Sequence, residues 1–567
     1  MKLQTTNNTN RYRWLFSIAM IVVIFLSTEA LAQNPANGIE ASGLEVSEDA
    51  RIVVVEPDNF PVEIGNLNET IEQEIDENTI FVLQRDAVYW TDRFIENENH
   101  RLHIRAEEGD GHPPIIRSTI DITGESTYNI RGVQDVIIEG VYFIGINENG
   151  VLERIIRFAG QNSTFVFDNG YMTGNHDIHI WVDNTDNRFY ITNSVITNVG
   201  RNENDQQGRL LDTRGNDQEV IYIENNTLYN LGHAFFRNSG GVTQHMHINH
   251  NTLMNLTQYA RVGEVQEMYF TNNLFTNVYT IGEAEDEMIR AFIEIREQPA
   301  GMDESERVLV FRNNNVSPLD QPFVDLIEER NTYDEENVIL PPPVLSRQYM
   351  DPENEYPLVD YENNIYERVQ FADEPPIDGY VDWTLRWMQN RVPGFPGDIM
   401  EEYDHPMFYD RWEDASDDPA PGHFTVDLLR DFTYTDDYES YTAAENGFPL
   451  GDLNWFPELK EAWIETGEIP TSVEEPGELA TEFRIVGNYP NPFNPTTNII
   501  YDLASQADVK VEVFNVIGQR VDVMDIGTQS PGRHEVTFDA QNLSSGVYMV
   551  RMQMGSEVQT INISLIK

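Results

Sequence analysis

Four arginines in the middle of the chain recur at similar intervals, each followed closely by glycine or a polar residue. They are Arg214, Arg237, Arg261 and Arg296, spaced by 23, 24 and 35 residues. A guanidinium group binds a carboxylate or a sulfate through two parallel N–H donors. If the four arginines share one face of a repeating fold, that face is predicted to bind an acidic polysaccharide.

A competing interpretation is that acids inside the protein neutralise these arginines. The candidate partners are Asp212, Glu264 and Glu294. Two other residues join the predicted binding set because they lie near the arginines in the sequence, Tyr259 before Arg261 and His233 before Arg237. The choice between a binding face and internal ion pairs stays open at this point.

Lyases that act on uronate polysaccharides neutralise a carboxylate, often with Ca²⁺ or arginine, and a base then removes the acidified proton. One such lineage pairs lysine with arginine, but residues 52–335 contain no lysine, so that pair is excluded. An arginine or tyrosine base remains open, for example Arg237 or Arg261 beside Tyr259. No catalytic residue is singled out.

Histidines and acids offer metal ligands without forming a complete set. His245 and His247 are two residues apart and would share one face of a strand. Solvent-facing or stacked histidines explain the same pattern. Glu203 and Asp205 are candidate Ca²⁺ ligands, although no stretch has the ligand spacing of the calcium-binding helix–loop–helix motif. Metal ligands and cofactors therefore stay unassigned, with Ca²⁺ as the candidate.

An internal repeat sets the elements that would position these residues. One nine-residue phrase occurs at 191–199, 223–231, 248–256 and 270–278, with weaker copies from Ile138, Phe167 and Phe311. Its apolar residues alternate, as in a strand with one buried face. The shortest interval, 22 residues, is too short for two helices and a turn, and asparagine is a poor helix former.

The repeat is typical of a parallel β-helix. Stacked coils would align four asparagines in one column, where their amides bond to each other and to the turns. These are Asn198, Asn230, Asn255 and Asn277. The predicted fold is all-β: a right-handed parallel β-helix, an irregular cap region, and a small C-terminal β-sandwich.

Composition excludes several classes of protein. The 567 residues carry a formal charge of −60, which argues against nucleic acid as a partner. There is no cysteine, so no disulfide can staple the chain. Only four lysines occur, and the acids are spread along the sequence, which favours a salt-adapted surface.

Six segments are predicted along the chain. They are a signal peptide (1–32), a polar leader (33–51), the β-helix (52–335), an acidic aromatic-rich capping region over its far end (336–467), a linker (468–482) and a C-terminal domain (483–567). The signal peptide is indicated by Arg11 and Arg13 before an apolar run, with Ala30-Leu-Ala32 as the cleavage site. No other apolar run reaches about 20 residues, so no transmembrane segment is expected in the mature chain.

Two stretches resemble known families. Residues 101–116 are similar to the opening coils of secreted pectate-lyase-like β-helix proteins, in which a strand, a glycine-rich turn and a second strand begin the solenoid. The second resemblance rests on the motifs Asn488-Tyr-Pro-Asn-Pro-Phe-Asn-Pro495, Asn515-Val-Ile-Gly-Gln519 and Leu543-Ser-Ser-Gly-Val-Tyr548. They resemble the type A C-terminal sorting domain of the type IX secretion system of Bacteroidota.

The second resemblance implies export through the periplasm to the outer cell surface or the medium, with the type IX machinery as a partner. Two functions of different classes remain. The first is binding of an acidic polysaccharide along the arginine face, with lyase cleavage of that polysaccharide left open. The second is a structural or adhesive surface protein in which the β-helix is a stiff spacer, because fold alone does not define function.

Overall fold

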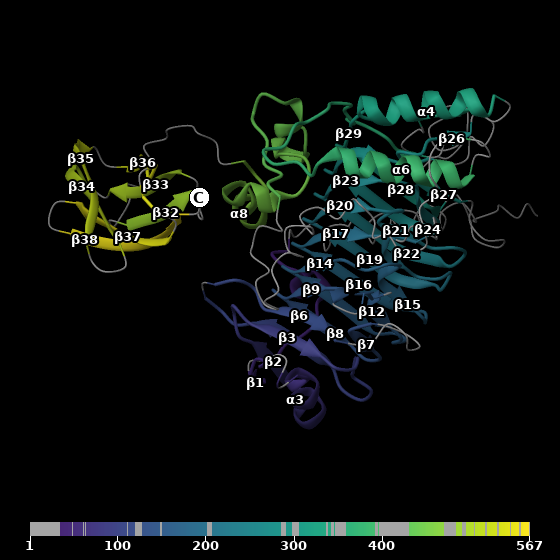
Figure 1. Ribbon diagram of the computed structural model, residues 1–567, viewed down its shortest axis with the longest axis horizontal. Helices are drawn as coiled ribbons and strands as arrows, with labels where there is room; N and C mark the ends of the chain where they lie inside the picture. The colour runs from purple at the N-terminus through teal and green to yellow at the C-terminus, as the bar shows by residue number, and fades with distance from the viewer. Residues whose placement is uncertain are drawn as a thin grey trace, which may run out of the picture. The chain divides into compact units, whose positions relative to one another are not determined.

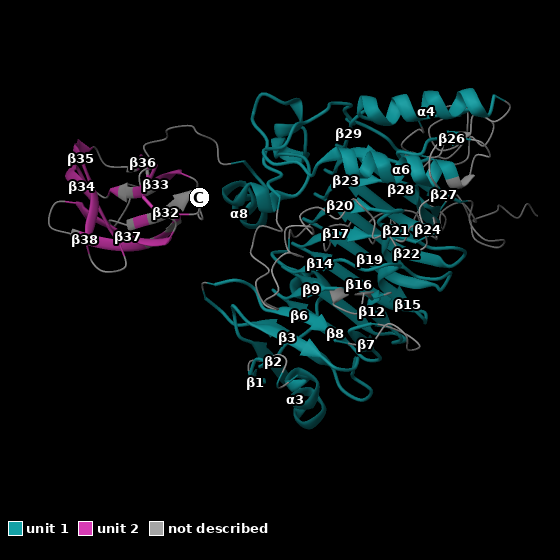
Figure 2. Ribbon diagram, viewed as in Figure 1, with its two compact units in different colours: residues 1–470 teal, residues 471–567 magenta. Residues whose placement is uncertain are grey.

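In the computed structural model, the chain divides into two compact units, residues 1–470 and 471–567 (Figure 2). The structure describes residues 35–469 and 484–565 except for gaps at 48, 60–61, 63, 110, 120–127, 148–149, 153, 201–206, 285–290, 297–305, 336–337, 342–344, 346–358, 392–394, 396–429, 490–494, 504, 516–518, 530–531, 542, 545 and 555–556. The predicted signal peptide and most of the predicted linker lie outside the described residues.

The first unit is built on a parallel β-helix whose coils have three faces (Figure 1). Face 1 consists of β1 (Arg51–Val55), β2 (Thr79–Leu83), β5 (Leu102–Ala106), β8 (Val136–Glu139), β13 (Thr164–Asp168), β16 (Asn187–Thr192), β19 (Gln218–Glu224), β22 (Val242–Asn249), the second part of β24 (Ala260–Thr271), β28 (Val308–Arg312) and β31 (Val359–Asp360). Face 2 consists of β3 (Val88–Thr91), β6 (Ile115–Ser118), β9 (Tyr142–Ile144), β14 (Tyr171–Thr173), β17 (Val195–Val199), β20 (Thr227–Leu231), β23 (Thr252–Leu256), β25 (Leu274–Val278) and β29 (Asn315–Val316). Face 3 consists of β4 (Ile95–Glu96), β7 (Ile130–Gly132), β12 (Arg154–Phe158), β15 (Ile178–Val182), β18 (Arg209–Asp212), β21 (Phe236–Arg237), the first part of β24 and β27 (Ile293–Ile295).

The predicted β-helix is confirmed by this topology. From β2 to β27 the chain passes repeatedly from face 1 to face 2 to face 3, as β16, β17 and β18 do. Pairing continues to β31, past residue 335, where the sequence pattern placed the end of the solenoid. Residues 101–116 contain β5 and begin β6, which are the strands expected on either side of their glycine-rich turn.

Stacking of the repeat follows the register predicted from the sequence. The leading apolar residue of each copy lies opposite that of the next, in the order Ile138, Phe167, Ile191, Ile223, Ile248, Phe270 and Phe311. All seven are buried in one continuous apolar core. The core forms because one face of each short strand is apolar and the neighbouring coils cover it.

The predicted asparagine column is confirmed. Asn230 Nδ2 lies 3.5 Å from Asn198 Oδ1, Asn255 donates to Asn230 over 3.0 Å, and Asn277 donates to Asn255 over 3.3 Å. All four backbones have positive φ, between 51° and 60°. Asparagine tolerates this left-handed conformation, and its buried amide finds partners in the coils above and below.

A second asparagine row at the corner between faces 1 and 2 was missed in the sequence. It comprises Asn226, Asn251, Asn273, Asn314 and Asn364. Each side-chain oxygen accepts the backbone N–H of the preceding member over 2.9–3.1 Å. The residue before each member has positive φ, and His250 occupies one of these positions in place of asparagine.

Helices cover both ends of the core. At the start, α3 (Asn66–Glu74) buries Leu67 and Ile71, and near the other end α4 (Gln321–Tyr333) buries Leu326 and Ile327. The segment predicted as a polar leader packs on the solenoid. It contains α2 (Gly38–Ser42), and Ile39 and Leu44 pack on the outer side of face 1 against Val166.

The capping region covers more than the far end of the solenoid. Residues 430–469 include η3 (Glu439–Tyr441), η4 (Glu445–Gly447), η5 (Leu453–Trp455) and α8 (Pro457–Glu465). Phe432, Phe448 and Leu453 form a cluster with Tyr229 and Met254, so this segment lies on the outer side of face 2. The capping region also contains α6 (Ile377–Arg391). In this helix the Tyr380 hydroxyl donates to Leu231 O, and Trp383 Nε1 donates to Thr257 Oγ1.

The remaining elements of the first unit are two antiparallel pairs, β10 (Ile146–Asn147) with β11 (Gly150–Val151) and β26 (Glu283–Ala284) with β30 (Ile339–Leu340).

The second unit has its own apolar core between two antiparallel sheets, as predicted for a β-sandwich. One sheet contains β32 (Arg484–Tyr489), β33 (Thr496–Leu503) and β36 (Gly532–Asp539), and the other contains β34 (Ala507–Asn515), β35 (Arg520–Gln529), β37 (Gly546–Met554) and β38 (Glu557–Leu565).

Candidate functional site

The four predicted arginines do not form one ladder. Arg237 and Arg261 are directly opposite each other on face 3, in β21 and β24. Arg214 and Arg296 each come two residues after the position that aligns with this pair. Acids occupy those aligned positions: Asp212 lies opposite Arg237 in the preceding coil, and Glu294 lies opposite Arg261 in the following coil. The condition that all four arginines share one register is therefore met only by Arg237 and Arg261.

Ion pairs neutralise part of this column. Arg261 Nε lies 3.1 Å from Glu294 Oε2, and Arg296 Nε lies 3.3 Å from the other oxygen of Glu294. Arg237 Nη1 lies 3.9 Å from Asp212 Oδ2. Two of the three acids proposed from the sequence are thus partners, whereas Glu264 lies on face 1 opposite Val242.

Arg214 is the exception among the four. Its side chain is exposed, and its guanidinium carbon lies 4.0 Å from the centre of the Trp181 ring. Arg154 contacts the same ring, also at 4.0 Å. Among the described residues, no carboxylate forms an ion pair with Arg214. An exposed arginine stacked on tryptophan keeps its N–H donors available for an anion.

Arg209 lies beneath this group and has an unusual environment. The residue is 1% exposed, and its Nη1 donates to Asp212 Oδ2 over 3.0 Å. Within the described part of the chain, its Nε and Nη2 have no hydrogen-bond partner. Burial lowers the pKa of Arg209 to about 9, which leaves it charged at neutral pH.

We call Arg154, Trp181, Arg209, Asp212, Arg214 and Arg237 the Trp181 cluster. The sequence gave little indication that Arg154, Trp181 and Arg209 belong to this cluster. Only Arg209 lies near a repeated arginine, five residues before Arg214. Trp181 and Arg154 come from the two preceding strands of face 3, β15 and β12. Their distance in sequence from the repeated arginines hid the grouping.

The strands of face 3 carry an excess of positive charge. They contain six arginines and three acids: Arg131, Arg154, Arg157, Arg209, Arg237 and Arg261 against Glu96, Asp212 and Glu294. The whole chain has a formal charge of −60. Two further acids, Asp177 and Asp183, flank β15 and pair with Arg154 and Arg157, so the excess of positive charge on face 3 is small.

Tyr259 and His233 lie beside the Arg237–Arg261 pair. Arg261 Nη2 donates to the Tyr259 hydroxyl over 2.7 Å. The ring centres of His233 and Tyr259 are 6.3 Å apart, and His233 is 6% exposed. Tyr259 can contact a ligand bound to Arg261, whereas His233 lies mostly beneath the surface.

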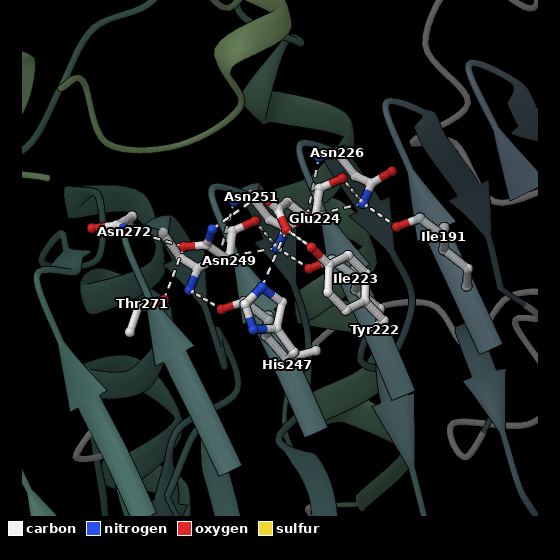
Figure 3. A network of polar contacts seen from close by, with 12 residues as sticks. Ile191, Tyr222, Ile223, Glu224, Asn226, His247, Asn249, Asn251, Thr271 and Asn272 are labelled. Carbon is white, nitrogen blue, oxygen red and sulfur yellow. Dashed lines mark hydrogen bonds and ion pairs between the residues drawn. The ribbon is translucent and has the colours of Figure 1, made fainter. Parts of the chain in front are cut away.

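The paired histidines on face 1 bind acids. His245 Nδ1 lies 3.0 Å from Glu267, and His247 Nε2 lies 3.1 Å from Glu224 (Figure 3). Glu224 also accepts from Tyr222 and from Asn249. Burial acts to raise the pKa of Glu224, but the His247 and Tyr222 hydrogen bonds hold it below its usual value. These contacts support stacked structural histidines.

Metal binding stays a prediction. In the described ranges, no group of three or more histidine, aspartate or glutamate side chains is arranged to hold a metal ion. The acids Glu203 and Asp205, suggested as Ca²⁺ ligands, lie outside the described residues.

The second unit identifies the export route. Residues 488–566 match the family model of the secretion system C-terminal sorting domain. This unit is a type IX secretion sorting domain. The protein is therefore exported to the cell surface or the medium, and its sorting domain interacts with the type IX machinery. No curated protein matches the chain. Of the helices described, none has the length and apolar character needed to cross a membrane.

Proposed function

We propose that this exported β-helix protein binds an acidic polysaccharide along face 3, with the Trp181 cluster as the main contact. The observation that carries the proposal is the exposed guanidinium of Arg214, held on the Trp181 ring without an acidic partner among the described residues. A free cation is unexpected on a chain with a formal charge of −60. A ligand that supplies the missing negative charge accounts for it.

Arg209 supports the same proposal. A buried guanidinium with unsatisfied N–H groups is costly, and a nearby anion reduces that cost through electrostatic attraction. The four arginines of the cluster, Arg154, Arg209, Arg214 and Arg237, outnumber the two acids beside them, Asp177 and Asp212. A carboxylate or sulfate group of the polysaccharide, bound at the surface of the cluster, would neutralise the remaining positive charge.

The proposed binding residues are Arg214, Arg237, Arg261 and Arg296, with Tyr259 and His233. Arg214 is expected to contribute most, because ion pairs with Asp212 and Glu294 occupy the other three arginines. Those ion pairs favour a second candidate function, in which the arginines stabilise coil stacking and the solenoid is a structural or adhesive spacer.

The polysaccharide-binding proposal extends to lyase activity, which is cleavage of the bound polysaccharide. Tyr259 and Arg261 are the candidates for it, because Arg261 Nη2 donates to the Tyr259 hydroxyl and holds the two groups together. The resemblance of residues 101–116 to pectate-lyase-like proteins concerns the pattern of strands and turn and includes no catalytic motif. Ca²⁺ is the candidate cofactor.

A titration of the mature chain, residues 33–567, with defined glycans tests the proposal. Polygalacturonate, alginate and a sulfated glycan are compared with a neutral glucan by calorimetry, with and without Ca²⁺. Absorbance of unsaturated uronate ends is followed in parallel. Binding to at least one anionic glycan, weaker at high salt, is expected. Absence of binding to all three would favour the spacer.

Two alanine variants locate the site. Arg214→Ala should weaken binding roughly tenfold, the size of one charge-assisted hydrogen bond. Arg188→Ala is the matched control, because Arg188 lies on face 1 and pairs with Glu219 at 2.5 Å. Equal losses in the two variants would remove face 3 from the proposal.

A further inference from the structure

Lys460 is the one lysine between residues 3 and 509, and it is placed in an unusual position. It lies on α8, and its Nζ donates to Asn193 Oδ1 and to Asn454 Oδ1, both over 2.6 Å. Within the described residues, no carboxylate lies close enough for an ion pair with it. The amine therefore contacts two side-chain amides on an otherwise acidic protein. Burial lowers the pKa of Lys460, which raises the fraction of neutral amine.

Asn193 is fixed at the corner between β16 and β17. Its backbone has a φ of 54°, and its Nδ2 donates to Asp168 Oδ1 over 2.8 Å and to Ala36 O over 3.1 Å. Asp168 is 7% exposed, and burial raises its pKa. An amine, an amide and a buried acid thus meet where the N-terminal segment, the solenoid and the cover on face 2 come together.

We propose that Lys460 and Asn193 form an intramolecular isopeptide bond with Asp168 as the acid–base group. Lys460 Nζ attacks Asn193 Cγ, the Cγ–Nδ2 bond breaks, and the amide nitrogen leaves as ammonia. Asp168 gives a proton to the departing nitrogen, and the attacking nitrogen returns one to the carboxylate. One amine and one primary amide become one secondary amide and ammonia. No oxidant or cofactor is required.

Asp168 fits this role better than Asp452, the acid beside the other amide. All three donors to Asp168, from Gly38, Thr192 and Asn193, meet Oδ1, so Oδ2 is left to carry a proton. Asp452 accepts at both oxygens, from Thr227 at Oδ2 and from Asn454 at Oδ1. Burial raises the pKa of Asp452 as well as that of Asp168, but the hydrogen bonds to both oxygens of Asp452 favour its ionised form and leave no oxygen free to carry a proton. We therefore assign the reaction to Asn193 and not to Asn454.

The bond would have a structural purpose in an exported chain without cysteine. It would join α8 to a turn 267 residues earlier and hold the cover against the solenoid. A covalent link of this kind restricts the unfolded chain much as a disulfide does. The inference does not depend on polysaccharide binding.

Tryptic mapping of the purified mature chain tests the bond directly. Trypsin does not cut after a lysine whose amine is an amide. The expected product is residues 431–484 joined to residues 189–201, with a mass about 17 Da below the sum of the two peptides because ammonia has left. Lys460→Arg, which cannot form the bond, should release residues 189–201 as a free peptide. Asp168→Asn should reduce the yield of the branched peptide at least tenfold.

Two other products would overturn the proposal. Separate peptides 189–201, 431–460 and 461–484 in the wild type would show that Lys460 is only hydrogen-bonded. Residues 431–484 with the same mass loss but without 189–201 would place the bond on Asn454. Cyclisation of the predicted N-terminal Gln33 causes an equal mass loss, so peptide assignment, and not intact mass, decides the result.

Discussion

The second asparagine row should contribute more to stability than any surface feature of the solenoid, and Asn251 is the best position to test this. Asn251 is 0% exposed. Its Nδ2 donates to Ile223 O, Asn249 O and Asn273 Oδ1 over 2.9–3.1 Å. Its Oδ1 accepts from Asn226 N at 3.1 Å and from Asn226 Nδ2 at 3.0 Å (Figure 3).

Replacement by alanine removes all five hydrogen bonds. The backbone N–H of Asn226 loses its side-chain acceptor inside the protein, which costs about 1–3 kcal/mol. The other four bonds contribute about 0.5–1 kcal/mol each. We therefore expect Asn251→Ala to lower the free energy of unfolding by about 3–7 kcal/mol.

Urea unfolding followed by tryptophan fluorescence measures this cost. All tryptophans of the mature chain lie between residues 90 and 463, so the signal reports the first unit alone. Asn184→Ala is the matched control, because Asn184 is exposed and its side chain makes one hydrogen bond, to Ala159 O at 2.7 Å. The control should change the unfolding free energy by no more than about 0.5 kcal/mol. Equal losses in the two variants would refute the reasoning.

Two further predictions concern pH and packing. Burial lowers the pKa of His179 to about 3, so between pH 6.5 and about 3 the unfolded chain binds a proton that the native chain does not. Proton binding to His179 in the unfolded chain lowers the unfolding free energy by about 1.4 kcal/mol per pH unit as the pH falls from 6.5 to about 3. His179→Gln should flatten the slope in urea titrations from pH 7.5 to 4.5, and an unchanged slope would contradict the assignment. Gly451→Ala should loosen the cover on face 2, because a Cβ there would lie 2.4 Å from Thr252 Oγ1. Gly447→Ala is the control at a similar φ of 83°, with 3.4 Å to its nearest neighbour. Limited proteolysis of residues 430–469 should be faster in the first variant alone, and equal rates would show that backbone strain and not the contact matters.

The fold could be predicted because the repeat is local. Each copy carries its own alternating strand and its own asparagine turn, so aligning the copies also gives the register of Ile223 with Ile248 and of Asn230 with Asn255. The second row was missed although its signal is present, as an asparagine three residues after the leading apolar residue in most copies.

The arginines could not be aligned in the same way. The segments between successive strands of face 3 differ in length, so the similar spacings of 23 and 24 residues did not place the arginines at equivalent positions. Asp212 and Glu294 occupy the positions opposite Arg237 and Arg261, and Arg214 and Arg296 lie two residues later, after the strands have ended or at their ends. The contact of Lys460 with Asn193 was equally hidden, because it depends on how residues 430–469 pack across face 2.

Amide hydrogen exchange of the mature chain, with and without the tightest-binding anionic glycan, tests the central claim most directly. The account predicts slower exchange on face 3, in peptides that cover 178–183 and 209–217, and unchanged exchange on face 1 in 242–249. Protection on face 1 alone, or protection nowhere with all three anionic glycans, would contradict binding along face 3.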